Sequence, residues 1–100
     1  MRRDEVVARL KEIEPALRAQ GVASLFLFGS YARDEATPES DVDVFVDPVS
    51  GEQFGFLPFM QAYETLRSAI GHGVELGYST RDGLDRYVRA RVEKEALKVF

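Results

Sequence analysis

Two aspartates separated by one residue are the first feature of this sequence that could do chemistry. Asp41 and Asp43 flank Val42 at the start of the run DVDVFVD. In a β-strand, side chains two residues apart point to the same face, with Cα atoms about 6.5–7 Å apart. Carboxylate oxygens are preferred ligands of Mg²⁺, so the pair could hold that ion. Taken alone, however, the pair is better interpreted as the solvated acidic face of a half-exposed strand.

A Gly-Ser pair precedes the aspartates and could bind phosphate. Gly29 and Ser30 directly follow the apolar run VASLFLF, and ten residues separate Ser30 from Asp41. Glycine lets the backbone approach a ligand closely, and amides that open a helix point at anions. Gly-Ser is also a common turn. The nearby Arg33 could either steady phosphates or pair with the neighbouring acids.

Glu75 supplies a possible third carboxylate, in a short apolar segment between Val74 and Leu76. Three carboxylates on neighbouring strands could hold two metal ions about 3.5–4 Å apart. By itself, Glu75 is more typical of the solvent side of an edge strand. A phosphate-binding turn beside a set of metal ligands forms a site for a nucleoside triphosphate with Mg²⁺.

Composition excludes several other kinds of site. The 100 residues contain no cysteine and one histidine, His72. Disulfides, thiolate nucleophiles and zinc–cysteine sites are therefore excluded, and a Ser-His-Asp triad is improbable. The net charge is −4, and six of the 17 acidic residues lie between Asp34 and Asp47. Because a nucleic-acid binder needs a basic surface, we do not expect direct nucleic-acid binding.

The length and hydropathy pattern predict one small cytoplasmic domain. A chain of this size supports a single core. No apolar run approaches the ~18 residues of a membrane span, and the N-terminal segment MRRDEVVARL lacks the pattern of a signal peptide. We therefore expect a single domain over residues 1–100 that has no membrane partner.

The first half of the chain predicts a helix and two strands. Apolar residues at helical spacing indicate a helix over residues 3–19, which Pro15 should kink or break near Lys11–Glu14. Strands are expected over 22–28 and 41–47, with a short helix opening after Ser30 and a polar loop over 34–40.

The second half predicts two helices and a third strand. One helix should begin near Pro58, and the strand should cover 74–78, with Glu75 on the opposite face from Val74. Asp82 is the expected cap of the last helix. The tail over 96–100 could prolong that helix or add an edge strand. The order α-β-α-β-α-β-α implies an α/β (α+β) fold, a small mixed β-sheet packed with helices.

Together, the stretch FGSYARDEATPESDVDVFV matches the GS-x10-DxD signature of nucleotidyltransferases related to DNA polymerase beta. It resembles the minimal nucleotidyltransferase (MNT) subgroup, encoded beside HEPN-domain proteins as toxin–antitoxin pairs. The resemblance is strongest over residues 25–47 and extends more loosely over the whole chain. It implies a nucleotidyltransferase fold in a single minimal domain.

The resemblance implies a role for each candidate residue. Gly29 and Ser30 would hold the triphosphate, with Arg33 as a further nucleotide-binding residue. The catalytic and metal-binding carboxylates would be Asp41, Asp43 and Glu75, which implies two Mg²⁺ ions. Glu75 departs from the family pattern, because an aspartate is usual at this position and the extra methylene moves the carboxylate outward by about one bond length.

The resemblance also implies a function, for which alternatives remain open. The expected enzyme moves AMP from ATP to a hydroxyl, a tyrosine of a partner HEPN toxin, and so acts as the antitoxin. The first alternative is a weak or inactive antitoxin that neutralises a HEPN ribonuclease by binding alone. A small-molecule nucleotidyltransferase that modifies an antibiotic is a third, less favoured interpretation.

Overall fold

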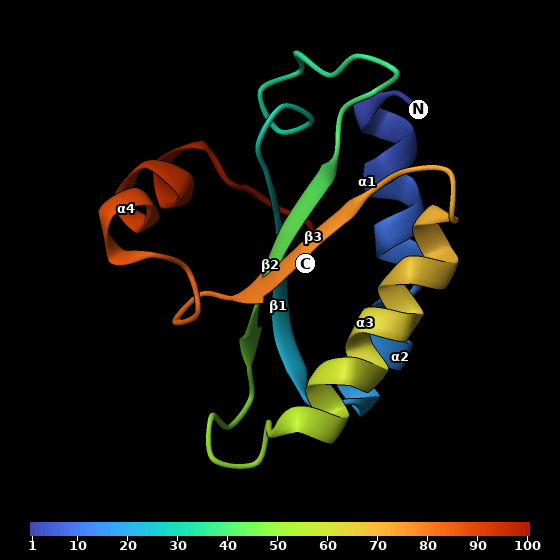
Figure 1. Ribbon diagram of the computed structural model, residues 1–100. Coiled ribbons are helices and arrows are strands. Elements are labelled where there is room, and N and C mark those ends of the chain that lie inside the picture. The colour runs from blue at the N-terminus through green and yellow to red at the C-terminus, as the bar shows by residue number, and fades with distance from the viewer.

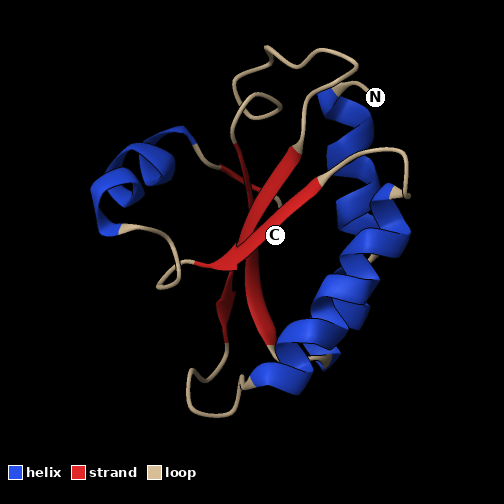
Figure 2. Ribbon diagram, in the orientation of Figure 1, coloured by secondary structure: helices blue, strands red, loops and turns tan.

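The protein folds into one mixed β-sheet with helices on both sides. The computed structural model describes all residues from Met1 to Phe100. The sheet has four strands in the order β3-β2-β1-β4. The elements are α1 (Arg3–Glu12), α2 (Glu14–Ala19), β1 (Val22–Phe28), β2 (Val42–Pro48), α3 (Phe56–Ile70), β3 (Leu76–Thr80), α4 (Arg86–Glu95) and β4 (Leu97–Lys98). Helices α1, α2 and α3 lie together on one side of the sheet, whereas α4 lies apart on the other side (Figures 1 and 2).

The predicted N-terminal helix is interrupted at Ile13, as the position of Pro15 indicates. Ile13 ends α1 and also precedes α2, in which Pro15 occupies the first turn. Proline is tolerated there because the first amides of a helix have no intrahelical partner. Gly21 follows α2 with a φ of 98°, a conformation that glycine adopts without steric cost. The sharp turn at Gly21 leads directly into β1.

Strands β1 and β2 pair antiparallel, and this pairing explains why the predicted short helix after Ser30 is absent. Phe28 of β1 lies opposite Asp43 of β2. Antiparallel neighbours need no crossover helix. Residues 29–34 form turns instead, in which the Arg33 amide donates to the Gly29 carbonyl at 3.1 Å. The predicted element order is therefore wrong at this point, while the bounds of β1 are confirmed.

Strand β3 pairs parallel with β2, and α3 connects the two strands. Val42 lies opposite Leu76 in the register. The strand begins at Leu76, two residues later than predicted, so Glu75 directly precedes it. The Val42 amide still donates to the Glu75 carbonyl at 2.9 Å, which fixes the backbone of Glu75 beside β2. Strand β2 also begins and ends one residue later than predicted.

The C-terminal segment differs from its prediction at the helix cap. Helix α4 begins after Asp85, whose carboxylate accepts a hydrogen bond from the Tyr87 amide at 2.8 Å. Asp82 was the wrong choice, because residues 81–84 form a turn before the helix. The tail resolves the open alternative, since Leu97 and Lys98 form a short strand antiparallel to β1.

The two faces of the sheet are packed differently. The main core lies between the sheet and α1–α3 and contains the alternate β2 side chains Val42, Val44 and Val46, all fully buried. On the other face, the rings of Phe26 and Phe45 stack at 4.7 Å. No helix of the protein has the length and apolar character needed to cross a bilayer.

Arg81 covers the second face of the sheet. Its guanidinium lies about 5 Å from the centres of both the Phe26 and Phe45 rings. It also pairs with Asp47 on β2 at 2.9 Å and with Glu93 on α4 at 2.6 Å. Arg81 therefore joins α4 to the sheet.

Candidate active site

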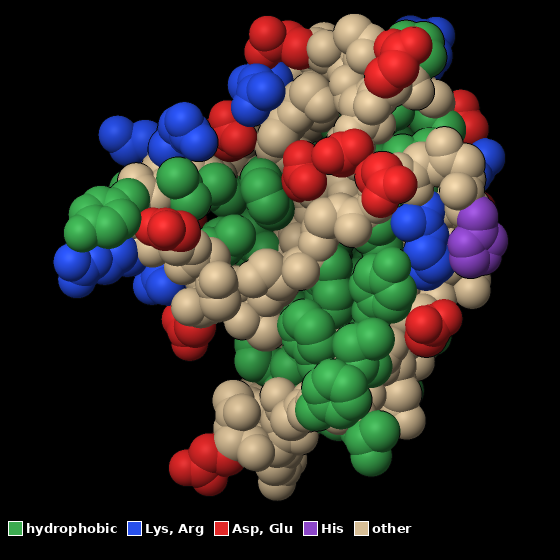
Figure 3. All heavy atoms as spheres, in the orientation of Figure 1, with side chains coloured by type: hydrophobic (Ala, Val, Ile, Leu, Met, Phe, Trp, Pro, Cys, Tyr) green, Lys and Arg blue, Asp and Glu red, His purple; other side chains and the backbone are tan.

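The predicted site residues come from three strand ends that meet at one edge of the sheet. Strand β1 ends where β2 and β3 begin, because β1 is antiparallel to β2 and β3 is parallel to it (Figure 1). The Gly29-Ser30 turn, the two aspartates and Glu75 therefore lie at the same end of the fold. Acidic side chains gather over this end in the space-filling view (Figure 3).

Asp43 lies between two glycines on the neighbouring strands. A Cβ atom added to Gly29 would lie 2.5 Å from Asp43 Oδ2, and one added to Gly77 would overlap Oδ1. Only residues without a side chain leave room for the carboxylate at these positions. Sequence reasoning found Gly29 but missed Gly77. The signal for Gly77 was a glycine within a strand, two residues after the third carboxylate, which often marks a close approach.

The environment of Asp43 disfavours its charged form. Burial raises the pKa of its carboxyl group, and the negative charges of Asp41 and Glu95 raise it further, while Arg33 acts in the opposite direction. None of the ion pairs of the fold involves Asp43. A crowded, half-buried carboxylate without an ion-pair partner is a group that a bound cation would stabilise.

Asp41 and Glu75 are exposed and flank Asp43 at the ends of their strands. Each directly precedes its strand, and the register of Val42 with Leu76 places the two residues side by side. No three carboxylate or histidine side chains form a closed set of metal ligands. Mg²⁺ usually keeps waters and substrate phosphates and takes only one or two carboxylates from the protein. The donor set at this edge therefore fits such an ion.

The Gly29-Ser30 turn is held firmly by its neighbours. Gly29 has a φ of 75°, which favours glycine. Tyr31, the next residue, is buried in the main core and anchors the turn there. The Arg3 guanidinium of α1 donates to the Ala32 carbonyl at 3.4 Å. The turn therefore presents its backbone to the site from a fixed position.

Arg33 pairs with acids, one of the two roles that the sequence left open. Its Nη1 donates to both carboxylate oxygens of Glu95, at 3.2 and 3.1 Å, and its Nε donates to Glu35 at 3.1 Å. Glu95 also accepts a hydrogen bond from the Gly29 amide at 3.2 Å. The pKa of Arg33 is raised, chiefly by its hydrogen bond to Glu95.

Glu95 was missed by sequence reasoning. It lies within residues 81–100, which contain six lysines and arginines and four acids, and neither its type nor its spacing from the other acids distinguishes it there. The fold brings it to the site because α4 ends beside β1, where β4 pairs with Phe26 and Leu27. The site therefore contains four carboxylates and one guanidinium around the half-buried Gly29-Ser30 turn.

This arrangement suits the handling of a polyphosphate. Backbone amides and a guanidinium at the Gly29-Ser30 turn can bind phosphate oxygens. The carboxylates of Asp41 and Asp43 lie next to that turn and would hold a divalent cation, which would neutralise phosphate charge there. Such a site positions a triphosphate for attack at phosphorus and requires no nucleophile from the protein.

The comparisons with known proteins agree with this chemistry. The family model described as "Nucleotidyltransferase domain" matches residues 5–99. The chain is 39% identical over 75 residues to "Protein adenylyltransferase MntA" of Thermococcus cleftensis, covering 67% of this chain and 74% of that protein. It is 33% identical over 78 residues to a "Putative protein adenylyltransferase" of Methanocaldococcus jannaschii, covering 78% and 77% of the two chains.

Solved structures give the same result for the fold. A structure described as "putative minimal nucleotidyltransferase" superimposes with a TM-score of 0.77 and 27% identity, covering 97% of this chain and 95% of that one. A nucleotidyltransferase-named structure from Sulfolobus solfataricus, at 17% identity and a TM-score of 0.55, shares the fold. The expected fold class is confirmed, and the chain belongs to the nucleotidyltransferase domain family, as an enzyme of the minimal type.

Proposed function

We propose that the protein transfers AMP from ATP to a tyrosine hydroxyl of a partner HEPN-domain toxin and thereby acts as its antitoxin. The observation that carries the proposal is the direct contact between Asp43 and Gly29, which brings a candidate metal ligand against the candidate phosphate-binding turn. Two relatives are named protein adenylyltransferases, and this supports a protein acceptor and the adenylyl group.

In the proposed reaction, the Gly29-Ser30 turn binds the triphosphate and the carboxylates orient it for attack. The Gly29 amide and Ser30 hold oxygens of the triphosphate, and Arg33 offsets their charge. Asp41 and Asp43, with Glu75, would hold Mg²⁺. Bound Mg²⁺ supplies charge neutralisation on the phosphates and lowers the pKa of a hydroxyl that it contacts. The acceptor oxygen then attacks the α-phosphorus in line, and pyrophosphate leaves.

Glu75 is placed to act on the acceptor side of the site. It is exposed, whereas Asp43 is half-buried against the phosphate-binding turn. An incoming hydroxyl reaches an exposed carboxylate first, so Glu75 is the proposed acceptor of the hydroxyl proton. The open edge of the sheet supports a protein acceptor, because a folded partner can present a tyrosine there without entering a deep cavity.

A mass measurement tests the proposed function. The purified protein is incubated with the product of the neighbouring gene, the proposed HEPN-domain partner, together with Mg²⁺ and ATP, and that protein is then weighed intact. We expect the mass of the partner to increase by one adenylyl group, and peptide mapping should place that group on a tyrosine. Parallel reactions with GTP, CTP and UTP determine which nucleotide is used.

The control is a double variant, Asp41→Asn with Asp43→Asn, which removes two charges and keeps the side-chain shapes. This variant should add no nucleotide. If the wild-type protein neutralises the toxin while leaving its mass unchanged, the enzymatic proposal is overturned in favour of neutralisation by binding. Neutralisation by the double variant at the wild-type level would have the same meaning.

A further inference from the structure

The carboxylate of Glu95 already occupies an anion-binding position at the site. Its Oε1 accepts hydrogen bonds from the Gly29 amide and from Arg33 Nη1, both at 3.2 Å, and its Oε2 accepts from the same Arg33 nitrogen at 3.1 Å. A backbone amide and a guanidinium converging on two oxygens also form a suitable arrangement for binding phosphate. In this structure a side chain of the protein itself uses both donors.

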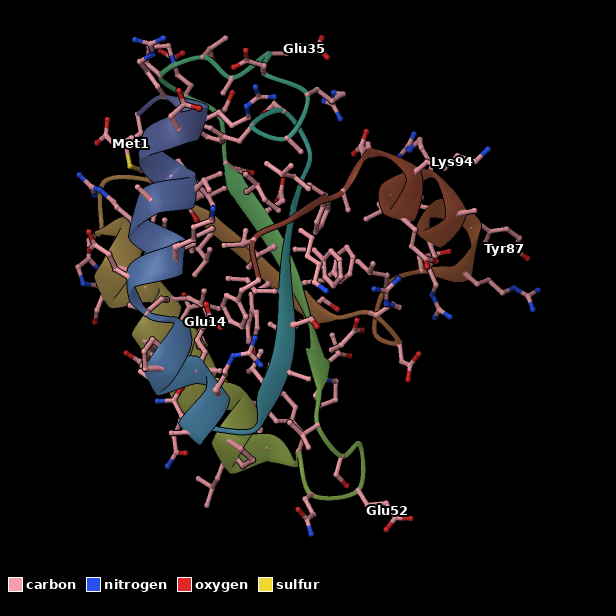
Figure 4. All side chains as sticks on the ribbon, turned by 180° about the vertical axis from the view of Figure 1, so that it is seen from behind. Met1, Glu14, Glu35, Glu52, Tyr87 and Lys94 are labelled. Carbon is pink, nitrogen blue, oxygen red and sulfur yellow. The ribbon has the colours of Figure 1, made fainter.

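The fold does not depend on this contact to hold α4 in place. Arg81 pairs with Glu93 of α4 and with Asp47 of β2, and Val92 is the buried apolar residue of the helix. Asp85 caps the other end. Helix α4 stands apart from the other helices, with Tyr87 directed into solvent (Figure 4). The Glu95 contact is therefore free to break without loss of the attachment of α4.

Glu95 also raises the negative charge next to the carboxylates. Its charge is one of the causes that raise the pKa of Asp43. A bound triphosphate would bring further negative charge to the same turn, so Glu95 and the triphosphate repel each other as well as compete for donors. Both effects disfavour a state in which Glu95 keeps its present position while the triphosphate is bound.

We propose that Glu95 is an internal competitor of the triphosphate, holding the Gly29 amide and Arg33 until a polyphosphate displaces it. This inference rests on the proposed function only in taking Gly29 and Arg33 as triphosphate-binding groups. Glu95 acts on affinity through these two donors. Its removal should lower the KM for ATP and leave the rate of the transfer step nearly unchanged.

The size of the effect follows from the exposure of the pair. The Glu95 side chain is 20% exposed and the Arg33 side chain 45% exposed. Pairs with such exposure are weak, so removing the competition in Glu95→Gln should tighten binding by about 1.4- to 5-fold. The variant keeps the shape of the side chain and removes its charge.

Titration calorimetry with magnesium tripolyphosphate tests the inference. Three single variants are compared with the wild-type protein: Glu95→Gln, Glu35→Gln and Glu93→Gln. Glu35 pairs with the same guanidinium through Nε but does not contact Gly29, so it reports the effect of charge alone. Glu93 lies on the same helix and pairs with Arg81 instead. Only Glu95→Gln should tighten binding by the full factor.

The amide resonance of Gly29 provides a second readout that a merely structural role would not move. In the ligand-free protein, Glu95→Gln should shift this resonance, and adding tripolyphosphate to the wild-type protein should shift it away from its Glu95-bound position. Glu93→Gln should leave it unchanged. Circular dichroism melting shows whether each variant is folded, and Glu95→Asp, which keeps the charge but shortens the reach, serves as a second variant at the same position.

Three results would overturn the inference. Weaker binding by Glu95→Gln would mean that Glu95 positions Arg33 for the phosphate. Equal tightening by Glu95→Gln and Glu35→Gln would mean that loss of negative charge alone explains the tighter binding, without competition for the Gly29 amide. If neither the wild-type protein nor any variant binds tripolyphosphate, there is no polyphosphate with which Glu95 could compete. Because tripolyphosphate carries no nucleoside and needs no acceptor, these results are independent of whether AMP transfer is observed.

Discussion

Two aspartates on the same face of β2 have opposite environments. Asp47 lies at the far end of the strand, where Arg81 contacts both of its carboxylate oxygens at 2.9 Å. Asp43, four residues earlier, lies between two glycines beside Asp41 and has no ion-pair partner. The paired carboxylate joins α4 to the sheet and serves the fold. The unpaired one carries a cost of burial that a bound cation would remove, which is expected of a functional site.

The largest expected effect comes from removing the charge of Asp43. In Asp43→Asn, AMP transfer should fall by at least ~100-fold, because loss of metal-site interactions commonly costs that much. The same change should stabilise the fold by about 0.5–1 kcal/mol, the scale of like-charge repulsion on a sheet face. Transfer is measured by mass spectrometry and stability by urea denaturation. Asp47→Asn is the matched control and should lose stability while keeping transfer. A destabilised Asp43→Asn protein would contradict the comparison.

The second-largest expected effect tests the end of β2 at which Asp47 pairs with Arg81. Arg81→Met keeps much of the apolar contact with the Phe26 and Phe45 rings. It removes the charged hydrogen bonds that Arg81 donates to Asp47 and Glu93. Hydrogen bonds to charged groups contribute about 1.5–3 kcal/mol, so the free energy of unfolding should fall by a comparable amount. Urea denaturation measures the change. Transfer per folded molecule should stay near the wild-type value, and a loss as large as that of Asp43→Asn would show that the two ends are not separate in function.

The third prediction concerns the space around Asp43. Gly77→Ala would place a methyl group against the Asp43 carboxylate, which must then shift. We expect transfer to fall by roughly 10-fold, since catalytic placement tolerates only ~0.5 Å, and the metal concentration needed for half-maximal activity to rise. Gly73→Ala is the control, because nothing lies near a Cβ atom at that position. Equal effects of the two substitutions would contradict the close contact as its cause.

The fourth prediction concerns the length of the third carboxylate. Glu75→Asp retracts the carboxylate by one methylene and matches the residue type usual for the family. If the extra reach misplaces the group, transfer should rise by a factor of about two to five, measured as the initial rate of AMP incorporation. Glu75→Gln should lower the rate. A loss of activity in Glu75→Asp would mean that the edge of β3 has adapted to glutamate.

Sequence reasoning succeeded where one local rule decided the structure. The apolar run indicated the bounds of β1, and Pro15 indicated a helix break near Lys11–Glu14, where the structure has one at Ile13. It failed where strand pairing decided, because nothing local shows that β1 and β2 are antiparallel and so need no helix after Ser30. Of two nearby aspartates, only the geometry of the turn selected Asp85 over Asp82 as the cap.

The candidate site shows the same division between local and long-range information. The spaced motif identified Gly29, Ser30, Asp41 and Asp43, which lie close together in sequence. Gly77 and Glu95 reach the site only through the register of β3 and the position of α4 beside β1. Such contacts depend on sequence separations of several tens of residues, and no spacing rule within one sequence predicts them.

The smallest expected effect is a pH dependence specific to Asp43. Its pKa is raised above the ordinary value of 3.8, so between 3.8 and the raised value the folded state holds a proton that the unfolded state has lost. The folded state then binds more protons, and the contribution of Asp43 to stability falls as the pH rises through this window. Below the window, Asp43 is neutral in both states and the contribution vanishes.

The difference in melting temperature between Asp43→Asn and the wild-type protein should therefore be zero at low pH and grow to roughly 2–8 °C at neutral pH. Taking the difference cancels the titration of carboxylates that do not interact with Asp43, including Asp47, whose pairing with Arg81 both proteins share. If this difference in melting temperature does not change with pH, the pKa of Asp43 is not raised in the folded state. The contrast between the unpaired Asp43 and the paired Asp47 would then be wrong.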